Sequence, residues 1–304
     1  MAELRFDGRV AVITGAGRGL GREYALLLAA RGAKVVVNDT GAAIKGEGID
    51  KGPADAVVDE IRAAGGEAIA ATQSVASAEG AAAIIAAATD AWGRIDILVC
   101  NAGNVRYGSL QEISEEDFRA VVDVHFMGAF HCVRSAFPRM VAGRYGRIVL
   151  TSSIGGVYGN SRVINYGMSK TAMIGLNNVA ALEGEAAGVK SNIILPGAVT
   201  RMAEGLDISQ YPPMGPELVA PMVGWLAHEE CSVTGEMYAA VGGRMARLLI
   251  AETPGVYRPA WTIDEVGAQI GAIRDKGPDN RALLDFGLHG HVDHLTYSFG
   301  MARK

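Results

Sequence analysis

Three features that the sequence lacks narrow the function classes open to this 304-residue chain. Its three cysteines, Cys100, Cys132 and Cys231, have no CxxC spacing, so they predict neither a disulfide framework nor a zinc ribbon. No apolar run reaches the ~18 residues of a membrane helix. The formal net charge is −5, which provides no general attraction to nucleic acid or anionic lipid.

Targeting signals are also missing from the sequence. The first residues, MAELRFDGRVAVITG, lack the basic region and apolar core of a signal peptide. The last four residues, MARK, do not form a peroxisomal address of the S-K-L kind. We therefore expect a cytoplasmic protein whose partner is a small molecule, not a nucleic acid or a membrane.

Short β-branched runs alternate with longer Ala- and Leu-rich segments along most of the chain. This alternation predicts an α/β fold with a Rossmann-like, doubly wound parallel sheet and helices on both faces. Continuously apolar strands agree, because parallel strands are buried on both sides. We predict seven strands, at residues 9–14, 33–39, 67–74, 94–103, 146–153, 189–197 and 235–243. The main helices are predicted at 20–32, 54–65, 78–93, 114–141 and 164–187, with Ser114 capping the fourth.

The composition changes after about residue 243, where charge increases and the strand pattern fades. We predict one catalytic domain over residues 1–243. Residues 244–304 are interpreted as a C-terminal extension that packs on the core or on a subunit interface.

A glycine-rich stretch, TGAGRGLG, follows the first predicted strand and opens the first predicted helix. Its spacing allows a tight turn and a close approach of the backbone to a pyrophosphate, while the helix N-terminus adds free N–H groups. A glycine-rich turn needed only for packing is the alternative. Because Asp39 ends the second predicted strand, we favour a dinucleotide site that includes Gly15, Arg18, Gly19, Leu20 and Gly21.

Asp39 favours NAD over NADP as the cofactor. A carboxylate at this strand end accepts hydrogen bonds from the adenosine ribose hydroxyls and repels a 2′-phosphate. Arg18 weighs weakly in the other direction, because a cation can pair with a phosphate. Asp39 has more weight because its place follows from the end of the strand.

Tyr166 and Lys170, in the segment YGMSK, lie four residues apart on a predicted helix and therefore share one face. A cation beside a phenol lowers the pKa of the phenol from ~10 and makes it a usable proton donor or acceptor. By itself, the pair is more typical of an ordinary helix surface. The other motifs of the chain decide between these interpretations.

Over about residues 5–243 the sequence resembles the short-chain dehydrogenase/reductase family. The matching pieces keep the family's order and spacing, and they are TGAGRGLG, CNAG at 100–103, Ser152-Ser153, Tyr166-xxx-Lys170 and Pro196-Gly197. The resemblance implies an oxidoreductase that moves a hydride between a secondary alcohol and a nicotinamide cofactor. Oxidation of an alcohol requires its hydroxyl proton to leave with the hydride, and a tyrosinate can accept that proton.

The resemblance also implies a role for each matched residue. Ser153 would hold the substrate oxygen, Tyr166 would donate or accept the proton, and Lys170 would lower the pKa of Tyr166 and bind the nicotinamide ribose. Ser152 would be structural. The residues that would complete the cofactor site are Asn101, Ala102, Gly103, Pro196 and Gly197.

Two positions depart from the family's pattern. The family usually has Asn where this chain has His125, in DVHFMG, and that Asn holds a water of a proton relay. His125 is either an ordinary core histidine or a replacement for the amide in the relay. Cys100 stands where Asn is commoner, a change that we expect to alter packing only.

Within the family, the chain most resembles the (3R)-hydroxyacyl-CoA dehydrogenase region of peroxisomal multifunctional enzyme type 2, also called 17β-hydroxysteroid dehydrogenase type 4. The features that carry this are VVVNDTGAAIKGEG, the histidine of DVHFMGAF, GGVYGN after Ser153, and APMVGWLAHEEC with GEMYAAVGG. This branch uses NAD and implies a 3-hydroxyacyl-CoA/3-oxoacyl-CoA pair. The alternatives are a hydroxysteroid dehydrogenase, a 3-oxoacyl-carrier-protein reductase, which usually favours NADPH, and an inactive NAD-binding sensor.

The remaining segments carry weaker signals. Arg201 and Arg244 are candidate contacts of CoA phosphates, although surface arginines are common. The tail histidines, His289, His291 and His294, lack a clear ligand spacing and an acidic partner set, so we predict no metal site. The family resemblance implies a homodimer or homotetramer whose subunits contact through helices around 115–141 and 164–187, and small and apolar residues on the second helix suit close helix packing. They are Ala172, Gly175, Leu176, Val179 and Ala180.

Overall fold

The chain divides into two units, Met1–Arg247 and Leu248–Lys304, and the described residues of the larger unit form a central sheet of eight strands. The structure, a computed structural model, describes residues 3–43, 45–48, 50–200 and 212–303. The strand order is β3-β2-β1-β4-β5-β6-β7-β8. The strands are β1 (Val10–Thr14), β2 (Lys34–Asn38), β3 (Glu67–Ala71), β4 (Ile97–Cys100), β5 (Gly146–Thr151), β6 (Val189–Gly197), β7 (Met237–Val241) and β8 (Arg244–Leu248).

The strands from β3 to β7 pair in parallel, as the sequence predicts. Strand β1 pairs with β2 on one side and with β4 on the other, so the strand order reverses at this point. Ligands of open α/β sheets bind outside the carboxyl ends of the strands at such a reversal. The fold therefore places a binding crevice beyond the ends of β1 and β4.

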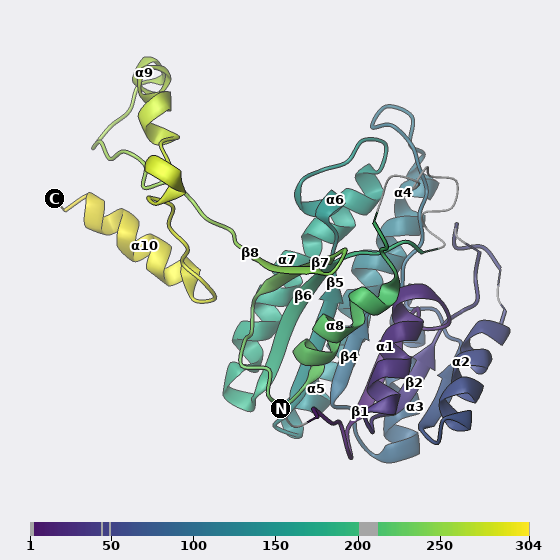
Figure 1. The fold of residues 1–304 in the computed structure, drawn as a ribbon. Helices are drawn as coiled ribbons and strands as arrows, with labels where there is room; N and C mark the ends of the chain where they lie inside the picture. Colours follow the sequence, from purple (N-terminus) through teal and green to yellow (C-terminus); the bar gives the residue numbers. More distant parts are fainter. Residues whose placement is uncertain (1–2, 44, 49, 201–211, 304) are drawn as a thin grey trace. The chain divides into compact units, whose positions relative to one another are not determined.

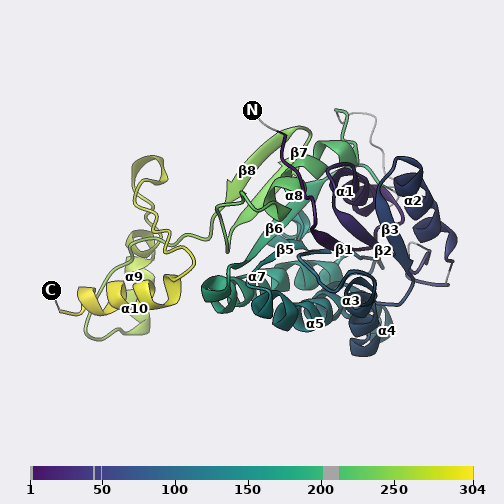
Figure 2. The ribbon, with the colours of Figure 1, turned by 90° about the horizontal axis from the view of Figure 1, so that it is seen from below.

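Helices cover both faces of this sheet (Figures 1 and 2). One face carries α1 (Gly19–Ala30), α2 (Gly52–Ala63) and α8 (Ala220–Ala227), and the other carries α3 (Ala78–Trp92), α5 (Gly128–Ala142) and α7 (Ile164–Gly184). The apolar stripes of α1, α2 and α8 close one core against β1 and β2. This packing fixes the loops at the strand ends, where the site lies.

The eighth strand is a difference from the predicted seven. Gly242 and Gly243 have φ values of 55° and 82°, which suits the two-residue turn of a hairpin between β7 and β8. Residues Arg244–Leu248 have no buried member, in keeping with a strand at the edge of the sheet. The strand escaped prediction because it has no apolar run.

The long helix predicted at 114–141 is interrupted. It begins as α4 (Glu115–Val122), with the Ser114 side chain accepting a hydrogen bond from the Asp117 N–H at 3.1 Å, which confirms the predicted cap. A π-helical turn, Asp123–Met127, then leads into α5. Single π turns inside helices are frequent at functional sites, and this one contains His125.

The smaller unit contains α9 (Ile263–Ile273) and α10 (Gly290–Met301). Thr262 and Glu265 form a capping box at the start of α9, and His294 pairs with Glu252 at 2.9 Å. None of its described residues is buried. Its packing on the core or on a subunit interface stays a prediction.

No helix among the described residues is long and apolar enough to cross a membrane. Within the same ranges, no group of three or more His, Cys, Asp or Glu side chains is arranged to hold a metal ion.

Candidate active site

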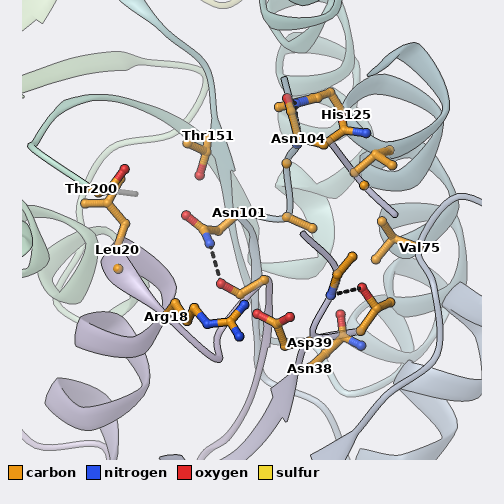
Figure 3. A pocket seen from close by; sticks show the side chains of 18 of the residues that line it. Arg18, Leu20, Asn38, Asp39, Val75, Asn101, Asn104, His125, Thr151 and Thr200 are labelled. Atoms are coloured by element: carbon orange, nitrogen blue, oxygen red, sulfur yellow. Dashed lines mark hydrogen bonds between the residues drawn. The ribbon is translucent and has the colours of Figure 1, made fainter. Parts of the chain in front are cut away.

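A pocket opens at the carboxyl ends of the strands, and most of the predicted cofactor residues line it. They come from the β1–α1 loop, from the ends of β2, β4 and β6, and from α7, and Figure 3 shows several of them around the pocket. These residues are Gly15, Arg18, Gly19, Leu20, Asp39, Asn101, Ala102, Gly103, Tyr166, Lys170 and Pro196. Gly21 and Gly197 are not part of the lining.

The glycine-rich loop leaves no room for side chains where the backbone turns. Gly15 has φ +64°, and a Cβ there would lie 2.7 Å from the Ala102 Cα. A Cβ on Gly21 would lie 2.2 Å from the Gly15 carbonyl oxygen, so Gly21 permits the turn and does not face the pocket. The first turn of α1 has no acidic residue and no side-chain cap among the described residues, so its N–H groups remain available to an anion.

Asn101 fixes the exit of β4 to the glycine-rich loop. Its Nδ2 donates to the carbonyl oxygens of Thr14 and Gly15, at 3.1 and 3.0 Å. In return, the Thr14 Oγ1 accepts from the N–H groups of Asn101 and Ala102. These bonds hold two walls of the pocket together and fit the cradle of a dinucleotide pyrophosphate.

Asp39 lies immediately after β2, on the pocket wall that Figure 3 shows at the opposite end from His125. Its two carboxylate oxygens accept hydrogen bonds from the Gly17 and Gly41 N–H groups, at 2.9 and 2.7 Å. The Arg18 Nη1 is buried and has no hydrogen-bond partner among the described residues. The pocket therefore presents both a carboxylate and an unused guanidinium donor where the adenosine end of a dinucleotide would bind.

Tyr166 lies where this pocket meets a second cleft, because it lines both. The second cleft is lined by Ser153 and by Val105, Tyr107, Ile154, Gly155, Tyr158, Gly159, Asn160 and Val163, and none of these described residues is charged. Ser153 lies between β5 and the short helix α6 (Ile154–Val157), and its Oγ accepts from the Gly155 N–H at 3.1 Å. We call this cleft the substrate cleft.

The pKa of Tyr166 differs in direction from the expectation. Burial raises it above its ordinary value, and a hydrogen bond with Ser153 offsets part of that rise. Lys170 does not lower it in the protein alone. The Lys170 Nζ lies 5.7 Å from the centroid of the Tyr166 ring and donates to the Thr151 carbonyl oxygen at 2.6 Å. Burial also lowers the pKa of Lys170 to about 7, which reduces the positive charge available to the phenol near neutral pH.

His125 points into the interior from the π-helical turn and is 4% exposed. Its Nε2 lies 2.8 Å from the backbone carbonyl oxygen of Asn104 and 3.0 Å from the backbone nitrogen of Asn104. Its ring meets the Tyr166 ring edge to face at 5.2 Å between centroids. Burial and the nearby Lys170 lower the pKa of His125 to about 3, so the imidazole is neutral. Its Nδ1 is buried without a partner among the described residues.

Ser152 and Cys100, which we predicted to have structural roles only, both contact neighbouring helices. The Ser152 Oγ donates to the Lys170 carbonyl oxygen at 2.7 Å, which holds α7 against the end of β5. Cys100 is buried against α5, where it lies beside Cys132.

Further residues that line the cofactor pocket were not predicted from the sequence. The end of β3 and the residues after it contribute Gln73, Ser74 and Val75, and the exit of β6 contributes Thr200. The rule that ligands lie beyond the strand ends would have identified these positions. Of the two candidate CoA contacts, Arg201 lies outside the described residues, and Arg244 is exposed at the start of β8.

The comparison with known families agrees with this geometry. Residues 9–208 match the model of the short chain dehydrogenase family. The chain belongs to this family. Membership of this family implies a nicotinamide dinucleotide as the cofactor.

The chain is also similar in sequence to individual enzymes. It is 49% identical over 261 residues to the peroxisomal multifunctional enzyme type 2 of Drosophila melanogaster, which covers 85% of this chain. The chain spans only 43% of the length of that enzyme. It is 38% identical to a 3-oxoacyl-[acyl-carrier-protein] reductase of Synechocystis, over 77% of this chain and 96% of the reductase.

Solved structures agree as well. A short chain dehydrogenase from Mycobacterium avium is 39% identical, with a TM-score of 0.79 over 90% of this chain and 97% of its own. The chain therefore has the fold of a short chain dehydrogenase.

Proposed function

We propose that this protein is an NAD-dependent dehydrogenase that interconverts a secondary alcohol and a ketone, with a 3-hydroxyacyl-CoA/3-oxoacyl-CoA pair as its substrate. The observation that supports this most directly is the place of Tyr166, which lines both the cofactor pocket and the substrate cleft beside Ser153. A proton-transfer group at that junction reaches both reactants.

When bound, the nicotinamide dinucleotide accepts or donates the hydride. Ser153 holds the substrate oxygen in this proposal. Its oxygen accepts from the Gly155 N–H, and its single hydroxyl proton, directed at Tyr166 in the protein alone, would turn to the substrate oxygen when substrate binds. Tyr166 removes the hydroxyl proton when the alcohol is oxidised and returns it when the ketone is reduced. The glycine-rich loop with Asn101, Ala102 and Gly103 would hold the pyrophosphate and ribose, and Pro196 with Gly197 would border the nicotinamide.

Lys170 supports the tyrosinate form in this proposal. It uses one N–H on Thr151 and has further donors that would hold the nicotinamide ribose hydroxyls. In the protein alone Lys170 does not lower the pKa of Tyr166, but with the cofactor bound its ammonium and the positive charge of the oxidised nicotinamide would together favour the phenolate.

His125 continues the proton path in this proposal. The neutral ring has one nitrogen bound to Asn104, while the other, Nδ1, is buried without a partner among the described residues, and His125 lines a small buried space together with Lys170 and Thr151. A water there would bridge Nδ1 to the Lys170 ammonium and the Thr151 Oγ1, which also has no partner among the described residues. His125 thus takes the part of the amide that is usual in the family.

The preference for NAD is supported by Asp39. Both of its oxygens are held by backbone N–H groups, so the carboxylate is fixed at the wall where an adenosine ribose would lie. Its negative charge opposes a 2′-phosphate. Arg18 is the group that would favour NADP.

The acyl-CoA substrate is supported by two observations. The uncharged, partly aromatic lining of the substrate cleft suits an apolar chain. The Synechocystis relative is named for a 3-oxoacyl group, and the Drosophila relative is a peroxisomal multifunctional enzyme. A hydroxysteroid is the second candidate, because the same lining suits a flat apolar ring system. The presence of Ser153, Tyr166 and Lys170 together argues against an inactive NAD-binding sensor.

We also propose a homodimer or homotetramer. Apolar side chains on α7 are exposed in the isolated chain: Met168 at 54%, Val179 at 52% and Leu182 at 41%. Among the described residues, no atom lies within 4 Å of a Cβ placed on Gly175 of the same helix, which leaves room for a second helix.

We propose the cytoplasm as the location of the protein. Because some relatives are named as peroxisomal enzymes, cell fractionation that separates cytosol from peroxisomes tests this.

A Tyr166→Phe variant tests the central assignment. The variant keeps the aromatic ring and its packing but has no phenol hydroxyl to exchange a proton, so turnover should fall by ~10²- to 10⁴-fold. Cofactor affinity, measured by fluorescence titration, should remain close to that of the unaltered protein. Turnover that survives this change would show that Tyr166 is not the acid/base group.

A further inference from the structure

Asn165, the residue before Tyr166, is completely buried in the first turn of α7. Its Oδ1 accepts a hydrogen bond from the Tyr166 backbone N–H at 2.8 Å. The first N–H groups of a helix have no partner within the helix, and Val163 at the N-cap provides no side-chain cap among the described contacts. Asn165 therefore satisfies the backbone of the residue whose phenol faces both reactants.

The other end of the Asn165 amide reaches two different segments. Its Nδ2 donates to the Arg106 carbonyl oxygen and to the Asp117 carbonyl oxygen, at 3.1 Å each. Arg106 belongs to the segment that leaves β4, and Asp117 belongs to α4. One buried side chain thus uses both of its N–H groups and its oxygen to tie three parts of the chain together.

The segment tied at Arg106 forms one wall of the substrate cleft. Val105 and Tyr107, on either side of Arg106, line that cleft. The segment is attached to the start of α7 a second time, because the Gly108 N–H donates to the Arg162 carbonyl oxygen at 3.0 Å. Tyr107 is therefore held between two anchors that both lead to the helix of Tyr166, while its own side chain stays 60% exposed.

We propose that Asn165 is a positioning residue that holds the Tyr166 phenol and the Tyr107 wall of the substrate cleft in a fixed relation. This inference rests on the proposed role of Tyr166. The Tyr107 phenol lies close enough to Tyr166 to act on its pKa, so a shift of the wall changes the surroundings of the proton-transfer group. Without the amide, the Tyr166 N–H would lose its side-chain acceptor, and the Arg106 and Asp117 carbonyl oxygens would each lose a donor.

Steady-state kinetics of Asn165→Ala test this, with Asn177→Ala as the matched control. Asn177 lies on the same helix and is also completely buried, but its side chain bonds to Ser191, away from both cavities. The Asn165 variant should lose roughly 10- to 100-fold in kcat and gain KM for the alcohol, because displacement of a reacting group by ~1 Å costs about that much. Its dissociation constant for NAD should match that of the control, since Asp39 and Asn101 are untouched.

Asn165→Asp provides a second test that does not depend on the alanine variant folding. The carboxylate keeps an acceptor for the Tyr166 N–H but has no donor for the two carbonyl oxygens. When protonated, it regains one donor, so its kcat relative to the unaltered protein should rise as pH falls. An Asn165→Ala variant with kcat and KM within about twofold of the Asn177→Ala control, or a flat ratio for Asn165→Asp, overturns the proposal. A Tyr166→Phe variant assayed alongside separates the two claims, because loss of its turnover keeps the proposed function whatever the result at Asn165.

Discussion

Replacement of Lys170 by methionine should change how the stability of the protein depends on pH. Lys170 is 5% exposed, and burial lowers its pKa from 10.5 to about 7. Between these two values the unfolded chain binds more protons than the folded protein, so the free energy of unfolding rises with pH across this window. Methionine has a similar length and no titrating group, and it removes this dependence.

The size of the effect follows from the two pKa values. At about pH 9 the folded lysine is neutral, and at about pH 6 it is charged inside the protein, so linkage predicts a loss of roughly 3 kcal/mol on this descent. The unaltered protein loses this unfolding free energy between about pH 9 and about pH 6, and the Lys170→Met variant does not. The difference in unfolding free energy between the two should therefore change by about that amount over the same range.

Urea unfolding followed by tryptophan fluorescence, without added cofactor, measures this difference at several pH values. Lys34→Met controls for the change in net charge, because Lys34 is a partly exposed lysine paired with Glu67 at 3.0 Å. A difference between the unaltered protein and Lys170→Met that stays constant from about pH 6 to about pH 9 would refute the idea that Lys170 is destabilised in its charged form.

Three further substitutions give separate checks. Gly103→Ala would put a methyl group 2.5 Å from the His125 Cε1, so it should lower the free energy of unfolding by ~1–3 kcal/mol, seen as a lower thermal midpoint. Gly271→Ala on α9, where no described atom lies within 4 Å of the added Cβ, should leave the midpoint unchanged. His125→Ala should lower kcat while leaving the NAD dissociation constant unchanged, and added imidazole should recover part of the rate if Nδ1 moves a proton; no recovery would count against the relay. Asp39→Asn should reduce the ratio of kcat/KM for NAD over NADP by roughly tenfold or more, or ~1.4 kcal/mol, and an unchanged ratio would assign the selectivity elsewhere.

Much of the sheet was predictable because its strands are short, apolar and separated by turn residues. The seven predicted strands all occur, and Gly15, Asp39 and Tyr166 line one pocket as their places at strand and helix ends imply. Apart from strand β8, which has no apolar run, the features that escaped prediction depend on contacts between distant segments. The π-helical turn around His125 is an example, since the sequence 114–141 is periodic enough for one helix.

The sequence predicted which residues line the site better than it predicted their pKa values. A four-residue spacing places Lys170 on the same helix face as Tyr166, but it does not reveal that the ammonium is buried against Thr151. Burial acts on both groups and opposes the simple pairing, so it raises the pKa of Tyr166 and lowers that of Lys170. Similarly, nothing near Asn165 in the sequence indicates that its amide contacts Arg106 and Asp117, far away along the chain.

The most direct test of the account is the initial rate of cofactor reduction with a (3R)-hydroxyacyl-CoA, compared between NAD and NADP and between the unaltered protein and Tyr166→Phe. The account predicts strong turnover with NAD, much weaker turnover with NADP, and almost none in the variant. Cofactor binding without turnover of the acyl-CoA would contradict the proposed substrate, and equal rates for the two proteins would contradict the mechanism.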